Sequence, residues 1–343
     1  MASRNGGQAP RQPVVMRGPV VAKGKDSRAS INAGNPVVNE AIPPRQVALH
    51  FTSDKVLLRG LQFGGFEVKQ SSSKLNIRRF REHYGVGAEA CASIFNDLYA
   101  TVIPTDENLR EFLMTMNWLK CYPTEGIMAG DWNLNEKTIR TKVKVHSQSI
   151  AALKAKKILF GNFEDDDVFV VSVDGIHCNI YEPRKDPSSK WYSHKSNSAG
   201  LTYELAIAIR SNRLVWIRGP FPASQHDMTT FRGGQVNEVK NANALQFQIP
   251  EGKRAIGDSG YRGEPSKISV SQPKDSASVR NFKSRVKARH ETFNARLKSF
   301  KILSTRFRHK LSTDTLVEHQ VVFEAVCVAC QYDMENDHGL FEV

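Results

Sequence analysis

The stretch VFVVSVDGIH, residues 168–177, places five apolar residues, four of them valine, in the six positions before Asp174. Valine is favoured in strands, and a short apolar run bounded by glycine is typical of a buried strand. A carboxylate is costly to bury unless it has a partner. The sequence therefore predicts a strand over 168–173 that ends at an aspartate with either a functional or a turn-forming role.

Strands and helices alternate from about residue 161 onward. The expected strands are VFVVSV (168–173), TYELAIAI (202–209), LVWIRG (214–219) and RAIG (254–257), and the expected helices span 227–242, 284–301 and 313–333. Three strands followed by a helix, a strand and further helices indicate an α/β fold with a mixed sheet. We expect one domain of this kind over 161–343.

The first 160 residues differ in composition and periodicity from the rest of the chain. Residues 1–45 are rich in Gly, Pro, Asn and Arg without periodicity, which predicts a disordered basic tail. Residues 46–160 read as a helical domain. Within it, 123–153 has the layout of a helix-turn-helix, with a short helix after Pro123 and a second helix capped by Asn135.

This helical pair has a predicted apolar side and a predicted basic side. The two helices are expected to pack through Ile127, Leu134, Ile139 and Val143. The basic side of the second helix, a candidate for DNA contact, carries Lys137, Arg140, Lys142 and Lys144. An ordinary helical hairpin would show the same pattern, so both interpretations stay open.

Charge favours an acidic partner. The 343 residues have a net charge of +13, and positions 274–310 hold 12 basic residues against Asp275 and Glu291, a surplus of ten. Such a concentration indicates binding of a polyanion, most commonly nucleic acid. No run of 18 uncharged apolar residues and no secretory signal is present, so we expect neither membrane insertion nor export. The CxxC at Cys327 and Cys330 lies in a periodic helical run and is expected only to pack.

Three acidic residues form the candidate catalytic set. Asp174 and Asp258 each follow an apolar strand, and carboxylates that meet at a sheet edge repel unless cations lie between them. Mg²⁺ accepts carboxylates, waters and phosphate oxygens, and a pair of such ions can cleave a phosphodiester. Glu291 is the third acid, because Glu291, Asn294 and Lys298 share one face of a helix. Taken singly, the aspartates could be turn residues, and Glu291 could form an ion pair with Lys287 or Lys298.

Four blocks of sequence carry a family resemblance: VDGIH (173–177), GPFPASQHDMTTFR (219–232), GDSGYRG (257–263) and RHETFNARLK (289–298). In this order they resemble the DDE-type transposases of the Harbinger superfamily and the nucleases derived from them, over about 110–343. The resemblance implies an RNase H-like catalytic core, a two-metal site for Mg²⁺ or Mn²⁺, and cleavage and transfer of DNA strands at transposon ends. It makes Asp174, Asp258 and Glu291 the catalytic triad and adds Asp227 as a fourth metal-site residue. Asp227 could also, or only, cap the helix that begins there, and capping is compatible with a metal-site role.

The resemblance also implies partners. These are double-stranded DNA at the transposon ends and target, a separate Myb-like DNA-binding protein, and further copies of the chain in a homo-oligomer. The expected location is the nucleus, or the cytoplasm with shuttling to the nucleus. A tyrosine, arginine, glutamate and lysine signature of related bacterial transposases reads here as Ser284, Lys287, Glu291 and Lys298. The first two positions depart from it, which leaves DNA-end handling open. The alternative function is a domesticated DNA-binding or chromatin-associated protein that keeps the fold without catalysis.

A loop and the basic helix complete the expected DNA surface. The loop at 181–200 interleaves basic and aromatic residues, which suits phosphates and unstacked bases. A merely solvated loop would look similar. The candidate DNA contacts from these two segments are Lys190, Trp191, Lys195, Lys287, Arg289 and Lys298.

Overall fold

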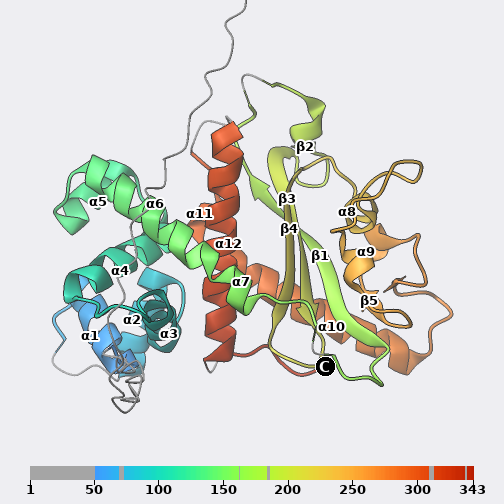
Figure 1. Cartoon of the computed structure of the whole chain (residues 1–343), viewed down its shortest axis with the longest axis horizontal. Helices are drawn as coiled ribbons and strands as arrows, with labels where there is room; N and C mark the ends of the chain where they lie inside the picture. The colour runs from blue at the N-terminus through green and yellow to red at the C-terminus, as the bar shows by residue number, and fades with distance from the viewer. Residues whose placement is uncertain (1–50, 69–72, 162, 184–185, 309–312, 337) are drawn as a thin grey trace, which may run out of the picture. The chain divides into compact units, whose positions relative to one another are not determined.

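The computed structural model describes residues 51–68, 73–161, 163–183, 186–308, 313–336 and 338–343, without the side chains of 313–315 (Figure 1). The predicted tail at 1–45 lies outside the described residues. All described residues belong to one compact unit. None of the described helices is long and apolar enough to cross a membrane.

The sheet is mixed, as the sequence predicted. Its strands are β1 (Phe169–Asn179), β2 (Tyr192–Ser193), β3 (Ser198–Ala208), β4 (Leu214–Pro222), β5 (Arg254–Ile256) and β6 (Ile268–Ser269). The order is β2-β3-β1-β5-β6, with β4 also pairing with β3. β3 is antiparallel to β1 and β4, whereas β5 is parallel to β1 and β6. The two-residue strands β2 and β6 were not predicted, because they are too short to show a period.

Strand β1 continues past Asp174, so the prediction that it ends there is wrong. On one side β1 pairs with β3 as far as Asn179 opposite Gly200. On the other side its pairing with β5 ends at Ser172 opposite Ile256. Asp174 therefore lies inside β1 but just beyond the end of the parallel pair, where no backbone of β5 lies beside it in the ladder.

Helices cover both faces of the sheet (Figure 1). One face contacts α8 (Asp227–Arg232) and α9 (Leu245–Gln248), where Val171 and Val173 share a buried cluster with Met228 and Phe231. The other face contacts α10 (Ala277–Lys298), α11 (Lys301–Ser304) and α12 (Thr313–Glu335). Alternate residues of β1 thus serve two separate layers, as the period of two in a strand requires.

The predicted helix at 227–242 is wrong in length, since α8 ends at Arg232. Gly233 follows with φ 79°, and a Cβ there would lie 2.7 Å from the Cβ of Ala244. Only glycine adopts this left-handed conformation in so little space. The glycine therefore ends the helix and turns the chain toward α9.

The N-terminal helices are α1 (Ser53–Phe63), α2 (Lys74–Tyr84), α3 (Ala88–Leu98), α4 (Asp106–Cys121), α5 (Glu125–Trp132), α6 (Glu136–Ala152) and α7 (Lys154–Lys157). One buried cluster runs from these helices through α12 to the sheet. Cys327 and Cys330 are free and buried in that cluster, where they pack against the core as predicted. Helix α12 therefore joins the helical part to the strands through shared core rather than through a linker.

The helical pair α5–α6 begins its second helix as predicted. Asn135 caps α6, its side chain accepting a hydrogen bond from the backbone N–H of Thr138 at 2.9 Å. The expected packing of Ile127 is wrong, because 54% of this residue is exposed. Met128 and Trp132, one turn apart in α5, are buried instead. The apolar side of α5 is thus rotated by one residue from the predicted one.

Candidate active site

Three aspartates come from separate segments of the fold. Asp174 lies in β1, Asp227 is the first residue of α8, and Asp258 follows β5 by two residues. Asp258 caps the short helix η2 (Ser259–Tyr261), its Oδ1 accepting from the N–H of Gly260 at 2.8 Å. His226, not Asp227, caps α8 through its Nδ1. The capping alternative for Asp227 is therefore wrong, which leaves its carboxylate available to the site.

Two glycines allow these aspartates to approach one another. A Cβ on Gly175 would lie 2.9 Å from Oδ1 of Asp227. A Cβ on Gly260 would lie 2.8 Å from Oδ2 of Asp227 and 3.0 Å from Oδ1 of Asp258. The Asp227 carboxylate thus lies against the backbone next to Asp174 on one side and close to Asp258 on the other. Side chains at either glycine would fill the space that the carboxylates occupy.

Burial and mutual repulsion raise the pKa values in this cluster. Burial is the main cause that raises the pKa of Asp174 to about 6, and the charges of Asp258 and Asp227 add to it. Burial also raises the pKa of Asp227, with Asp258 as the next cause. The Lys195 ammonium lowers both values, which places it near the two carboxylates. The cluster therefore has unfavourable negative charge that a cation would offset.

The donor set suits a hard divalent cation. Carboxylate oxygens are the ligands that Mg²⁺ and Mn²⁺ prefer, and three carboxylates stand close together here. Within the parts of the chain that the structure describes, no three His, Cys, Asp or Glu side chains are already arranged to hold a metal ion. Asp174, Asp227 and Asp258, which come from three separate segments, are the residues whose carboxylates would hold such a cation.

Helix α10 lies along β1 and brings a further side chain to the cluster. Asn294 Nδ2 donates to Oδ2 of Asp174 at 2.9 Å. Glu291, one turn earlier on the same face of α10, is exposed, and no contact described in the structure joins it to the three aspartates. The sequence placed Asn294 and Glu291 on one face but did not identify Asn294 as the residue that touches Asp174.

Glu204 is a buried acid that the sequence analysis missed. It lies in β3 opposite Gly175, with 1% of its surface exposed. Trp216 donates its indole N–H to Oε2 at 3.3 Å, and Oε1 is buried without a partner. Burial raises the pKa of Glu204 to about 8. Its signal in the sequence is a lone glutamate in the apolar strand TYELAIAI.

The loop before β3 presents different aromatic residues from those predicted. Trp191 is buried, with 7% exposed, and donates its indole N–H to the carbonyl of Asp186 at 2.9 Å. Tyr192 is 40% exposed and lies edge-on to His194, with ring centroids 5.3 Å apart. The N–H of Ser224 donates to the carbonyl of Lys190 at 3.0 Å, which ties the loop to the segment before α8. Tyr192, His194 and Lys195 are therefore exposed residues of this loop, and Lys195 interacts electrostatically with Asp174 and Asp227.

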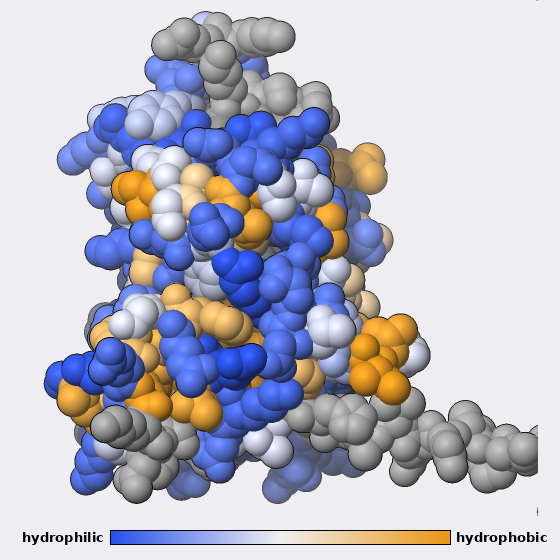
Figure 2. Space-filling model, turned by 90° about the vertical axis from the view of Figure 1, so that its left-hand side faces the viewer, coloured by the Kyte–Doolittle hydropathy of each residue, from blue (hydrophilic) through white to orange (hydrophobic). Residues whose placement is uncertain are grey.

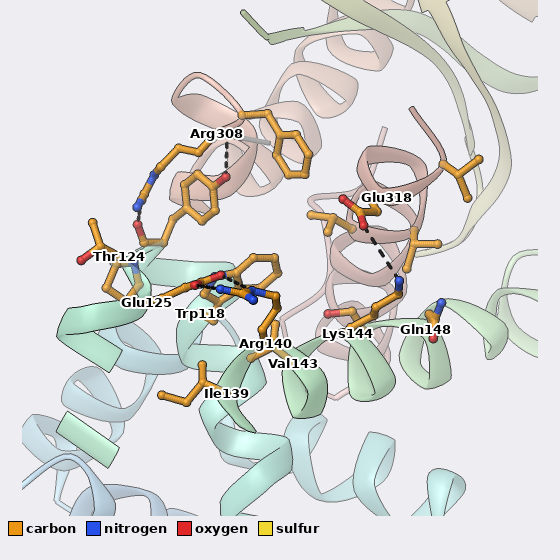
Figure 3. A pocket seen from close by; sticks show the side chains of 17 residues that line it. Trp118, Thr124, Glu125, Ile139, Arg140, Val143, Lys144, Gln148, Arg308 and Glu318 are labelled. Carbon is orange, nitrogen blue, oxygen red and sulfur yellow. Dashed lines mark hydrogen bonds and ion pairs between the residues drawn. The ribbon is translucent and has the colours of Figure 1, made fainter. Parts of the chain in front are cut away.

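The basic residues of α6 are mostly paired within the protein. Lys142 forms an ion pair with Glu111 at 2.6 Å, and Arg140 pairs with Glu125. Lys144 lies 4.0 Å from Glu318, on the rim of a cavity of about 1110 Å³ between α6 and α12 (Figure 3). Lys137 is exposed. The face formed by the N-terminal helices is largely hydrophilic, with separate hydrophobic patches (Figure 2).

The basic residues of α10 have contrasting positions. Arg289 is 4% exposed and donates to the carbonyls of Ala208, Ser211 and Phe341. Lys298 donates to the carbonyls of His177 and Leu303. Lys287 is half-buried. Arg289 and Lys298 therefore stabilise the fold through these hydrogen bonds, and we do not propose them as DNA contacts.

Comparison with known proteins supports a transposase or nuclease function. Residues 173–331 match the family model described as DDE superfamily endonuclease. The chain is also 24% identical, over 270 residues, to a probable transposase for insertion sequence element IS702 of Microchaete diplosiphon, an alignment that covers 70% of this chain and 91% of that protein. No solved structure matches the chain. The range 173–331 contains Asp174, Asp227, Asp258 and Glu291.

Proposed function

We propose that this chain is a divalent-metal-dependent DNA endonuclease of the DDE type, acting as a transposase or as a nuclease descended from one. The crowding of Asp174, Asp227 and Asp258 where β1 extends beyond the end of β5 carries this proposal. All three lie in the range that matches the endonuclease family. The four sequence blocks that resemble the Harbinger superfamily support that narrower assignment, with an RNase H-like core.

The chain's own residues have distinct parts in the reaction. Asp174, Asp227 and Asp258 bind the cations, and Glu291 completes the set from α10. Bound cations supply an activated water and offset charge on the leaving oxygen of a phosphodiester. Lys195, exposed beside the carboxylates, contacts a phosphate of the DNA. Tyr192 and His194, exposed in the same loop, offer aromatic faces to an unstacked base.

Further DNA contacts come from the helical part. Lys137 and Lys144 are exposed on α6, the second helix of the helix-turn-helix-like pair. We assign them to the backbone of double-stranded DNA, where Lys serves as a point charge for phosphates. Assembly as a homo-oligomer, with a Myb-like partner protein in the nucleus, follows from the Harbinger resemblance and belongs to the same proposal.

Substitutions that remove only charge test the function. Asp174→Asn, Asp227→Asn, Asp258→Asn and Glu291→Gln are expected to abolish Mg²⁺- or Mn²⁺-dependent cleavage of duplex DNA while a gel-shift assay shows DNA binding retained. Asp166→Asn, an exposed acid before β1, is the matched control and should cleave as the wild type does. Undiminished cleavage by all four variants would reject the proposal. A wild-type protein that binds DNA but cleaves with neither cation would favour the non-catalytic alternative.

A further inference from the structure

Helix α10 is held in register along β1 by three polar contacts. Nδ1 of His290 lies 2.9 Å from Oγ of Ser172, Asn294 Nδ2 donates to Asp174, and Lys298 donates to the carbonyl of His177. The three α10 residues are spaced four apart, so they form one stripe on the helix. Their partners on β1 ascend in the same direction. This register places Asn294, not Glu291, directly against Asp174.

The Asp174 carboxylate is fixed at both oxygens. Its own neighbour Gly175 donates a backbone N–H to Oδ1 at 2.9 Å, and Asn294 donates to Oδ2 at 2.9 Å. Two donors on opposite oxygens fix the rotation of the carboxylate about its Cβ–Cγ bond. The Gly175 donor is backbone and comes with the strand. The Asn294 donor is a side chain, and it depends on the residue type at this position.

An amide is the appropriate donor at this position. A lysine or arginine would neutralise Asp174 and compete with a bound cation, whereas a carboxylate would repel it. An amide donates a hydrogen bond without cancelling the negative charge. Partners of this kind orient metal-binding carboxylates and are known to affect metal affinity and activity strongly.

The Oδ1 atom of Asn294 shows that stability of the fold alone does not explain an asparagine at this position. Its Oδ1 is buried without a hydrogen-bond partner. Turning the amide over would place that oxygen against the Asp174 carboxylate, so the orientation with Nδ2 toward Asp174 is the favourable one. A buried acceptor without a donor costs stability, about 1–3 kcal/mol in general. The residue is better explained by the orientation of Asp174 than by packing.

We propose that Asn294 is a positioning residue, whose side-chain N–H holds the Asp174 carboxylate in the rotation needed to bind the catalytic cation. The proposal rests on the proposed function, because it requires a cation at Asp174. It assigns the role to the amide nitrogen and not to Oδ1. Direct binding of the cation by Oδ1 is the competing outcome of the test.

The experiment titrates the full chain with Mn²⁺ alone by calorimetry and measures DNA cleavage in parallel. Asn294→Ala is expected to weaken Mn²⁺ binding roughly tenfold, the lower end for residues that orient a metal ligand. Asn281→Ala, at an exposed position of the same helix, is the matched control and should bind as the wild type does. Thermal unfolding checks that each variant folds. Unchanged Mn²⁺ affinity in Asn294→Ala would overturn the proposal.

Asn294→Asp separates the two atoms of the amide. It keeps the shape and the oxygen but, when ionised, lacks the donor. We expect cleavage by Asn294→Asp to fall as it does in Asn294→Ala. Wild-type cleavage by Asn294→Asp would assign the role to Oδ1 and overturn the proposal. Asp174→Asn in the same titration tests the proposed function separately. If Asp174→Asn binds Mn²⁺ like the wild type, the proposed function fails. If Asp174→Asn loses Mn²⁺ binding while Asn294→Ala keeps it, only the role of Asn294 fails.

Discussion

Asp174 makes the metal-free protein less stable at neutral pH. The pKa of an aspartate in an unfolded chain is about 3.9, and burial raises that of Asp174 to about 6 in the folded protein. Between these values the folded state binds the proton more tightly than the unfolded state does. The free energy of unfolding therefore falls as pH rises from about 4 to about 6, and the loss is complete above that range. Such a cost is characteristic of functional sites.

The first prediction removes this charge. Asp174→Asn should raise the free energy of unfolding of the metal-free protein by roughly 2 kcal/mol at about pH 7.5, and by little near pH 4. Chemical denaturation in the presence of a chelator measures the effect at both pH values. Added Mn²⁺ should then stabilise the wild type but not the variant, because only the wild type has the complete site. A variant less stable than the wild type at neutral pH would contradict this account of Asp174.

The second prediction concerns the space that Gly260 leaves open. An added Cβ would lie within 3.0 Å of oxygens of both Asp227 and Asp258. Gly260→Ala should displace these carboxylates and lower the cleavage rate about 100-fold, as small misplacements of reacting groups can do. DNA affinity should be unchanged. Gly130→Ala in α5, where no atom lies within 4 Å of the added Cβ, is the control, and equal cleavage by the two variants would show that the site tolerates the displacement.

Local chemistry made some elements predictable from sequence. The cap at Asn135 was predictable because capping depends on residues within one turn. The extension of β1 to Asn179 was not, because GIHCN (175–179) has a weak strand pattern and is held by pairing with β3, far along the chain. The early end of α8 was missed because the helical pattern continues through Gly233 while the backbone there cannot.

The site was predictable to a similar extent. Asp174 and Asp258 stood out as acids after apolar runs, and Asp227 came from the family resemblance alone. The contact of Asn294 with Asp174 depends on the register of α10 along β1, and Glu204 enters the site through the pairing of β3 with β1. Both are long-range relations that a pattern along the chain does not contain.

The third prediction belongs to helix α10. Arg289 donates to three backbone carbonyls, one of them in the C-terminal segment, and is buried. Arg289→Met should therefore leave buried carbonyls without donors and lower the free energy of unfolding by about 3 kcal/mol. Its effect on DNA affinity, measured with folded protein at low temperature, should be negligible. Arg280→Met, at the exposed start of the same helix, should change stability little. A selective loss of DNA affinity in Arg289→Met would restore this residue to the DNA surface.

At the scale of the whole molecule, net charge alone does not locate the DNA. The formal charge is +13, yet many of the cations are engaged within the protein. Lys142 pairs with Glu111, and Arg289 and Lys298 bind carbonyls. Lys137 and Lys195 are both exposed, on α6 and beside the aspartates respectively. If DNA spans both parts, it is these exposed cations that displace counterions from the phosphates.

The last prediction therefore concerns the salt dependence of binding. Each phosphate that a cation neutralises contributes about −0.9 to the slope of log affinity against log salt concentration. Lys137→Ala combined with Lys195→Ala should make the slope shallower by about 1.8, whereas Lys142→Ala should change it by much less, because Glu111 already balances that charge. Fluorescence anisotropy with a labelled duplex over a range of salt concentrations gives all the slopes. If only Lys195→Ala changes the slope, the DNA contacts the aspartate site and not α6. If only Lys137→Ala changes the slope, the DNA contacts α6 and not the aspartate site. A slope that neither residue affects would exclude both surfaces.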